Sequence, residues 1–128
     1  MASLYSETER RVERNRKRIK NIISKLQQGT VVVEGKHDKL VMGKLGVGCI
    51  TFDKLIKNND SVDSRIPVYI LVDNDRSGKI KREEAIESLL DLDRNYKIDL
   101  DLGLLLLKIA KRRRVEEIYK PINEILDS

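Results

Sequence analysis

The chain has 128 residues, a length that suits one folded core with one appendage and is too short for two cores. No apolar run is long enough to cross a bilayer, and the first residues lack the apolar core of a secretory signal, so we expect a soluble cytoplasmic protein that binds no membrane. The net charge is +5, and eight basic against three acidic residues between Glu7 and Lys25 account for all of it.

Residues 7–28 contain neither Gly nor Pro, which predicts a helix that Gly29 ends. We therefore divide the chain into an N-terminal basic amphipathic helix, residues 1–28, and a domain formed by residues 29–128. The apolar side of the helix packs on that domain or on a second copy of the chain, which would give a homodimer. The other side is either a solvated surface or a contact for nucleic-acid phosphates. The apolar side consists of Val12, Ile19, Ile22, Ile23 and Leu26.

Strands and helices alternate through the rest of the chain, which predicts an α/β fold with a mostly parallel sheet of about four strands flanked by helices. The expected strands are Thr30–Glu34, one within residues 46–52, Val68–Val72, and an alternating edge strand at Tyr96–Leu100. The expected helices are residues 36–45 with Asp38 as N-cap, Asp53–Lys57 with Asp53 as N-cap, Lys79–Leu92, Leu104–Arg113, and Val115–Leu126, which Pro121 kinks or interrupts.

Two of the expected strands end abruptly in acidic residues. Thr30–Val33 leads into Glu34, and Val68–Val72 leads into Asp73 and Asp75. In open parallel sheets, ligands bind just beyond the carboxyl ends of the strands. Three carboxylates at this edge therefore predict a cation site.

The second acidic run also fits the pattern of an EF-hand calcium loop. Asp73, Asp75 and Ser77 fall on the first three ligand positions, Gly78 on the sharp turn and Glu84 on the bidentate position. An EF-hand, however, needs a helix that enters the loop, and the residues before Asp73 have the composition of a strand. Calcium binding is thus kept only as a remote alternative.

The two acidic runs together resemble a known signature. Val32-Val33-Glu34-Gly35 with Asp38, and Leu71-Val72-Asp73-Asn74-Asp75 with Gly78, are similar to the motifs of the Toprim fold of topoisomerases, bacterial-type primases and ribosomal-RNA-maturing nucleases. The resemblance covers residues 30–115 and is greatest to the small stand-alone Toprim proteins. It implies that Glu34 is the acid/base group and a metal ligand, and that Asp73 and Asp75 bind Mg²⁺, which Mn²⁺ could replace. Gly35, Asp38 and Gly78 would shape the site.

The chain has no room for the additional domains that a topoisomerase or a primase needs. The resemblance therefore implies a metal-dependent nuclease that acts on RNA or DNA. The alternative is a Toprim module that binds nucleic acid in a larger complex without turnover. In either case the expected phosphate contacts are Lys36, Arg76, Lys79, Arg10, Arg14, Arg18, Arg112 and Arg113.

Overall fold

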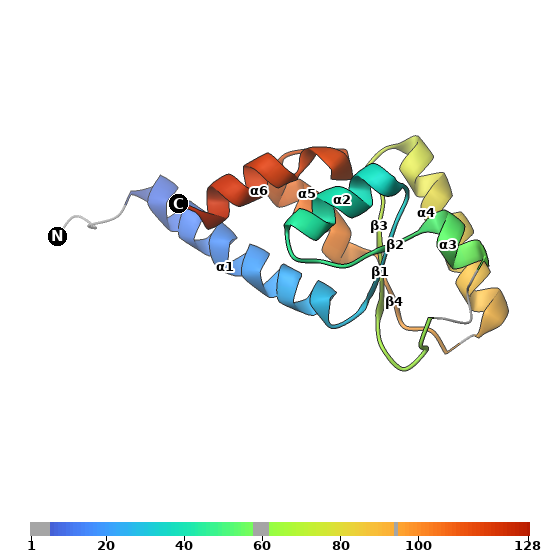
Figure 1. Ribbon diagram of the computed structural model, residues 1–128. Helices are drawn as coiled ribbons and strands as arrows, with labels where there is room; N and C mark the ends of the chain where they lie inside the picture. The colour runs from blue at the N-terminus through green and yellow to red at the C-terminus, as the bar shows by residue number, and fades with distance from the viewer. Residues whose placement is uncertain (1–5, 58–61, 94) are drawn as a thin grey trace.

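The computed structural model describes residues 6–57, 62–93 and 95–128. In this part of the chain, four strands form one sheet in the order β2-β1-β3-β4, and every neighbouring pair is parallel. Helices cover both faces of the sheet (Figure 1). The predicted α/β fold class is confirmed. The strands are β1 (Thr30–Val33), β2 (Ile50–Thr51), β3 (Val68–Leu71) and β4 (Ile98–Asp99).

The helices follow the predicted order, with several boundaries shifted. They are α1 (Glu7–Gln27), α2 (Lys36–Lys44), α3 (Phe52–Lys57), α4 (Arg76–Leu92), α5 (Asp101–Ala110) and α6 (Tyr119–Leu126), with a short 3-10 helix, η2 (Val115–Glu117), before α6. The break in the last segment lies at Ile118, between η2 and α6. Pro121 lies in the first turn of α6, where a missing N–H costs no helical hydrogen bond, so it does not kink the helix.

Both predicted N-caps were wrong. Gly35 is the N-cap of α2, and Asp38 lies inside the first turn, where its carboxylate accepts a hydrogen bond from the Gly35 N–H at 3.2 Å. Helix α3 begins at Phe52, one residue before Asp53, and the hydroxyl of Thr51 accepts the Lys54 N–H at 3.5 Å. In both places the helix begins earlier than the expected cap, and a side chain accepts a backbone N–H at its start.

The edge strand β4 is shorter than predicted, and side chains in it and beside it contact other segments. The Tyr96 hydroxyl donates a hydrogen bond to the Val62 carbonyl at 2.9 Å. At the other end, the Asp99 carboxylate accepts the Leu102 N–H at 2.9 Å and so supports the start of α5. As a result α5 begins at Asp101, three residues before the predicted start.

The alternating side chains of the central strands divide the core into two layers. Val31, Val33 and Leu71 pack with α1, α5 and α6 on one face, whereas Val32 and Ile70 pack with α3 and α4 on the other. Continuous apolar strands are therefore explained by burial on both faces.

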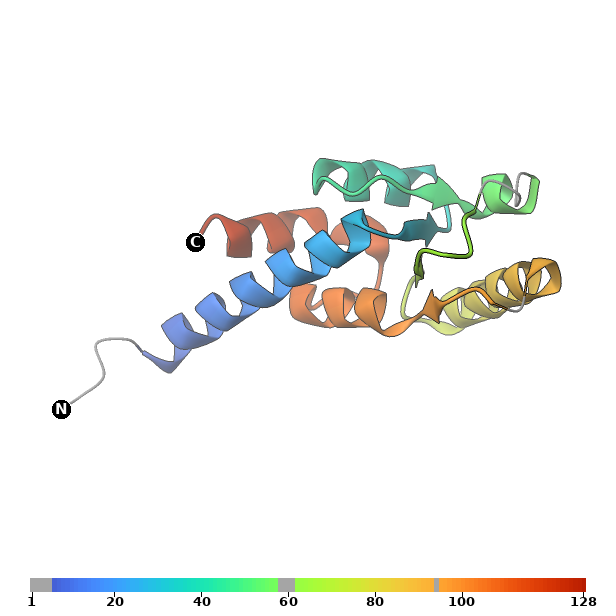
Figure 2. The same cartoon turned by 90° about the horizontal axis from the view of Figure 1, so that it is seen from below.

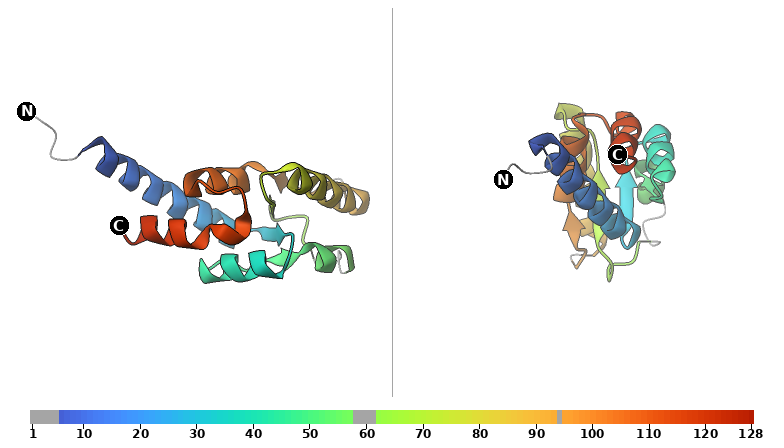
Figure 3. Two further views of the ribbon diagram at one scale, coloured as in Figure 1. Left: turned by 90° about the horizontal axis from the view of Figure 1, so that it is seen from above. Right: turned by 90° about the vertical axis from the view of Figure 1, so that its left-hand side faces the viewer.

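The C-terminal half of α1 belongs to the first layer through the buried side chains of Ile19, Ile22 and Leu26. Helix α1 contacts α5, α6 and β1. The N-terminal half extends past the sheet beside α6 (Figures 2 and 3). Much of the apolar side of α1 is thus used within the chain. None of the helices in the described residues combines the length and the apolar character needed to cross a bilayer.

Candidate metal and nucleic-acid site

The register of β1 and β3 brings the two acidic runs to one edge of the sheet. Val33 pairs with Leu71, so the residues that follow, Glu34 on one strand and Val72 with Asp73 on the other, leave the sheet side by side. Adjacent strands lie about 4.8 Å apart. Glu34 and Asp73 are both half-buried. The strand pairing therefore places Glu34 and Asp73 at the same edge of the sheet, beyond the carboxyl ends of neighbouring strands.

A segment after α5 crosses the end of β3 and holds Asp73 in place. The Asp73 carboxylate accepts the Val115 N–H at 2.8 Å, and the Asn74 N–H donates to the Arg113 carbonyl at 2.7 Å. Lys111, in the left-handed region with φ 56°, ends α5 and turns the chain toward this crossing. The basic run from Lys111 to Arg114 is thereby placed at the acidic edge.

Arg114 is a residue of this edge that sequence reasoning missed. Its Nε lies 3.9 Å from Asp73 Oδ2, and its guanidinium also pairs with Glu116 and Glu117. The only signal in the sequence was its position in the run Lys111-Arg112-Arg113-Arg114. Arg112 and Arg113, which were predicted, are exposed beside it.

Asp75 and Gly78 shape the start of α4. The Asp75 carboxylate accepts the Gly78 N–H at 2.7 Å as the N-cap of the helix. A Cβ at Gly78 would lie 1.9 Å from the Asp73 carbonyl oxygen, so only glycine fits there. Gly78 thus packs directly on the backbone of Asp73, inside α4, which begins at Arg76.

The start of α4 at Arg76 is incompatible with an EF-hand calcium loop. Residues from Arg76 onward are helical, so the twelve residues from Asp73 to Glu84 do not form a calcium loop. Strand β3, not a helix, enters this segment. Glu84 lies exposed on α4, more than one helical turn beyond Asp75.

Negative charge gathers around Asp38. Burial raises the pKa of the Asp38 carboxyl, the hydrogen bond from Gly35 lowers it, and the charges of Asp73, Glu34 and Glu116 raise it further. A bound cation would relieve this repulsion. Among the described residues, no three His, Cys, Asp or Glu side chains form a ready-made metal cage. Mg²⁺ typically binds through one or two carboxylates, waters and substrate phosphates, and the residues present fit such an open site.

A cavity of about 340 Å³ opens beside Glu34, at the ends of β1 and β2. Lys36, Lys54 and Lys57 line it together with Thr51. Lys54 and Lys57 were not predicted as site residues. Their spacing of three residues on a short helix after a strand was the available signal, because residues three apart share one helix face.

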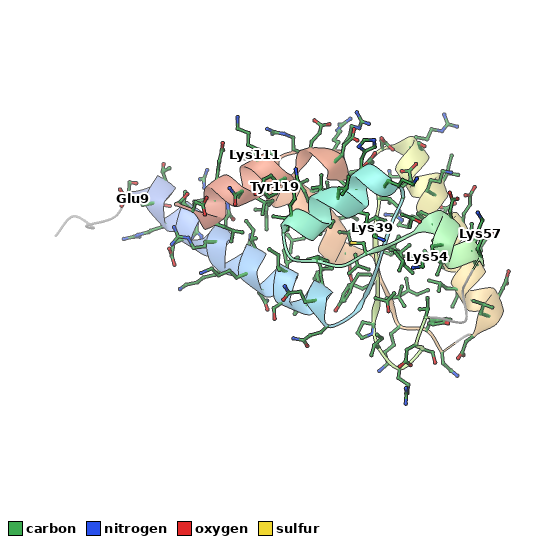
Figure 4. The ribbon with its side chains drawn as sticks, viewed as in Figure 1. Glu9, Lys39, Lys54, Lys57, Lys111 and Tyr119 are labelled. Atoms are coloured by element: carbon green, nitrogen blue, oxygen red, sulfur yellow. The ribbon has the colours of Figure 1, made fainter. Side chains whose placement is uncertain are left out.

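The other predicted phosphate contacts divide into two groups. Lys36, Arg76 and Lys79 are exposed on the first turns of α2 and α4, which follow the acidic strand ends. Arg10, Arg14 and Arg18 are exposed on α1. Figure 4 labels Glu9 at the free end of α1, well away from Lys54 and Lys57 on α3. The N-terminal half of α1 is therefore a separate basic surface.

Comparisons with known proteins add the fold but no family. No family model matches the chain, and no curated protein matches its sequence. A solved structure of a protein from Aquifex aeolicus is similar, with a TM-score of 0.63 and 22% sequence identity over 78% of this chain and 97% of that chain. At this level of identity the likeness shows a shared fold alone.

Proposed function

We propose that this chain is a Mg²⁺-dependent protein of the Toprim type that processes phosphodiester bonds of RNA or DNA in the cytoplasm. The observation that carries the proposal is the pairing of Val33 with Leu71, which aligns the strand ends that lead into Glu34 and Asp73. The motif resemblance supports the same pair of residues. The crossing segment that leads into Arg114 adds positive charge next to them.

In this proposal Asp73, Asp75 and Glu34 would hold the ion, and Glu34 would have a second role as the acid/base group. The hydrogen bond from Val115 orients Asp73. A bound Mg²⁺ supplies neutralisation of phosphate charge and orientation of the leaving oxygen. Glu34, on the neighbouring strand end, transfers a proton to or from the reacting oxygen. Arg112, Arg113 and Lys36 attract the nucleic-acid backbone through charge.

A cleavage assay with labelled RNA and DNA hairpins in Mg²⁺, Mn²⁺ or Ca²⁺ tests this function. We expect cleavage in Mg²⁺ or Mn²⁺, its loss in Glu34→Gln, and full activity in Glu84→Gln, which makes the same chemical change on the exposed side of α4. Cleavage that survives Glu34→Gln would remove Glu34 from the mechanism. Absence of cleavage in every metal would contradict the enzymatic proposal.

The projecting basic half of α1 favours one second candidate, a Toprim module that binds nucleic acid without turnover. Arg10, Arg14 and Arg18 lie on this exposed surface. For such a module, changing all three to Glu weakens nucleic-acid binding and reduces its dependence on salt, while no metal produces cleavage. Binding that is insensitive to salt would contradict this candidate. Pairing of two copies through α1 stays a prediction that sedimentation analysis can test.

A further inference from the structure

Lys54 and Lys57 line the cavity beside Glu34 together with Lys36, and neither of them has a role in the function proposed above. We propose that Lys36, Lys54 and Lys57 bind a phosphate of the nucleic-acid chain next to the phosphate that is processed. This inference rests on the proposed function for the identity of the ligand. The three lysines position the substrate, and none of them takes part in bond cleavage.

The sheet order places the cavity on the opposite side of Glu34 from Asp73. Strand β1 lies between β2 and β3, and the cavity is at the ends of β2 and β1. Along the carboxyl edge of the sheet, the lysine cavity, Glu34 and Asp73 therefore follow one another. Neighbouring strands are about 4.8 Å apart. A nucleic-acid chain that lies along this edge would present one phosphate at the acids and a neighbouring phosphate at the lysines.

The lysines are free to bind an anion. Lys36, Lys54 and Lys57 are exposed, and within the described ranges none of them is in an ion pair. Three positive charges in the lining face the two negative charges of Glu34 and Asp53. Because Glu34 belongs to the proposed cation site, the rest of the cavity has a clear excess of positive charge.

A short helix anchored in the core carries two of these lysines. Lys54 and Lys57 are one turn apart on α3 (Figure 4), and α3 is anchored by the buried side chains of Phe52 and Leu55. The third, Lys36, is the first residue of α2. Two helices that start at neighbouring strand ends thus direct lysines into one cavity.

The composition and size of the cavity indicate its ligand class. Lysines recognise phosphate as point charges, and phosphate contacts position a nucleic acid without reading its sequence. A volume of about 340 Å³ falls in the range of small-ligand pockets, so it accommodates a phosphate with part of its nucleotide. We therefore expect binding that does not depend on the base.

Fluorescence anisotropy with labelled RNA and DNA hairpins tests the inference. The titrations use the full chain in EDTA, where metal-dependent cleavage does not occur, over a series of salt concentrations. The variant is Lys54→Ala/Lys57→Ala. The matched control is Lys25→Ala/Lys97→Ala, which removes the same charge near the starts of β1 and β4, at the opposite edge of the sheet. Thermal unfolding of both variants checks that the fold is unchanged.

We expect the slope of log K against log salt to become shallower by about 0.7 for single-stranded or 0.9 for duplex contacts when one phosphate contact is lost. This loss should be the same for hairpins of different sequence, and the control should bind like the wild type. A Lys54→Ala/Lys57→Ala variant that matches the control, or a wild type that binds neither RNA nor DNA, would overturn the inference. Failure of the proposed cleavage is detected separately, in the Mg²⁺ assay with Glu34→Gln.

Discussion

The substitution Gly78→Ala tests how tightly the start of α4 is packed against the acidic edge. The added Cβ would lie 1.9 Å from the Asp73 carbonyl oxygen and 2.8 Å from its carbonyl carbon. To reach 3.0 Å from that oxygen, below which real Cβ contacts essentially never occur, the backbone must move by about 1.1 Å. Both groups belong to the main chain, so no side chain can rotate away to make room.

The expected cost is the balance of two effects. Alanine is the better helix former by about 1 kcal/mol, whereas overpacking in a filled site costs roughly 1–3 kcal/mol and more where the backbone must shift. Because the clash is with main-chain atoms, the overpacking cost should be about 3 kcal/mol or more, and after the gain of about 1 kcal/mol we expect Gly78→Ala to lower the free energy of unfolding by about 2 kcal/mol or more. Displacement of Asp73 and Asp75 should also abolish the metal-dependent cleavage.

Gly43→Ala is the matched control. Gly43 lies in α2, and an added Cβ there meets no atom within 4 Å. This variant should gain about 0.5–1 kcal/mol because Ala replaces Gly inside a helix without strain. Urea unfolding followed by circular dichroism measures both. If Gly78→Ala is as stable as the wild type or more stable, the close approach of Gly78 to Asp73 does not exist.

Three further predictions concern single side chains near the core and the site. Burial raises the pKa of the Cys49 thiol to about 12, so Ellman's reagent should not modify it at neutral pH until the protein unfolds; rapid modification of the native protein would contradict its burial. Asp73→Ala should lower the free energy of unfolding by about 1–3 kcal/mol, because the Val115 N–H loses its hydrogen-bond acceptor. Asp73→Asn keeps an acceptor oxygen, so its free energy of unfolding should fall by less in the same urea titration. The folded-state pKa of Asp38 is raised, mainly by burial, so ionisation of Asp38 destabilises the fold as pH rises, and Asp38→Asn should be more stable than the wild type above the raised pKa. That difference should vanish below the unfolded pKa of about 3.9, and urea titrations that show the same difference at both ends of the pH range would contradict it.

The sheet was predictable from the sequence because its central strands are continuous apolar runs. Val31–Val33 and Val68–Leu71 are buried, with side chains on both faces of the sheet, and continuous apolar runs are typical of a covered parallel sheet. The acidic edge could be predicted from the same runs, because parallel strands have their carboxyl ends at the same edge of the sheet and both runs lead into acidic residues. Helix boundaries were less predictable. The starts of α2 and α5 depend on hydrogen bonds from Gly35 to Asp38 and from Leu102 to Asp99, where several polar residues in sequence could serve as caps.

Contacts between distant segments were outside the reach of sequence patterns. The hydrogen bond from Val115 to Asp73 joins residues 42 positions apart, and it decides that Arg114 lies at the acidic edge. The lysine cavity likewise depends on the parallel pairing of β2 with β1, which places the start of α3 beside Glu34. Strand β2 has only two residues, too few for a pattern to define its register.

The central claim is that the acids after β1 and β3 share one divalent cation. Broadening of backbone amide signals by substoichiometric Mn²⁺ in ¹H–¹⁵N NMR spectra tests this claim directly, because the effect falls off with distance from the ion. The account predicts that signals around Glu34 and around Asp73 broaden together, that excess Mg²⁺ reverses the effect, and that Asp73→Asn weakens it at both places. Broadening confined to residues 73–84, or no selective broadening at all, would contradict a site built from two strands.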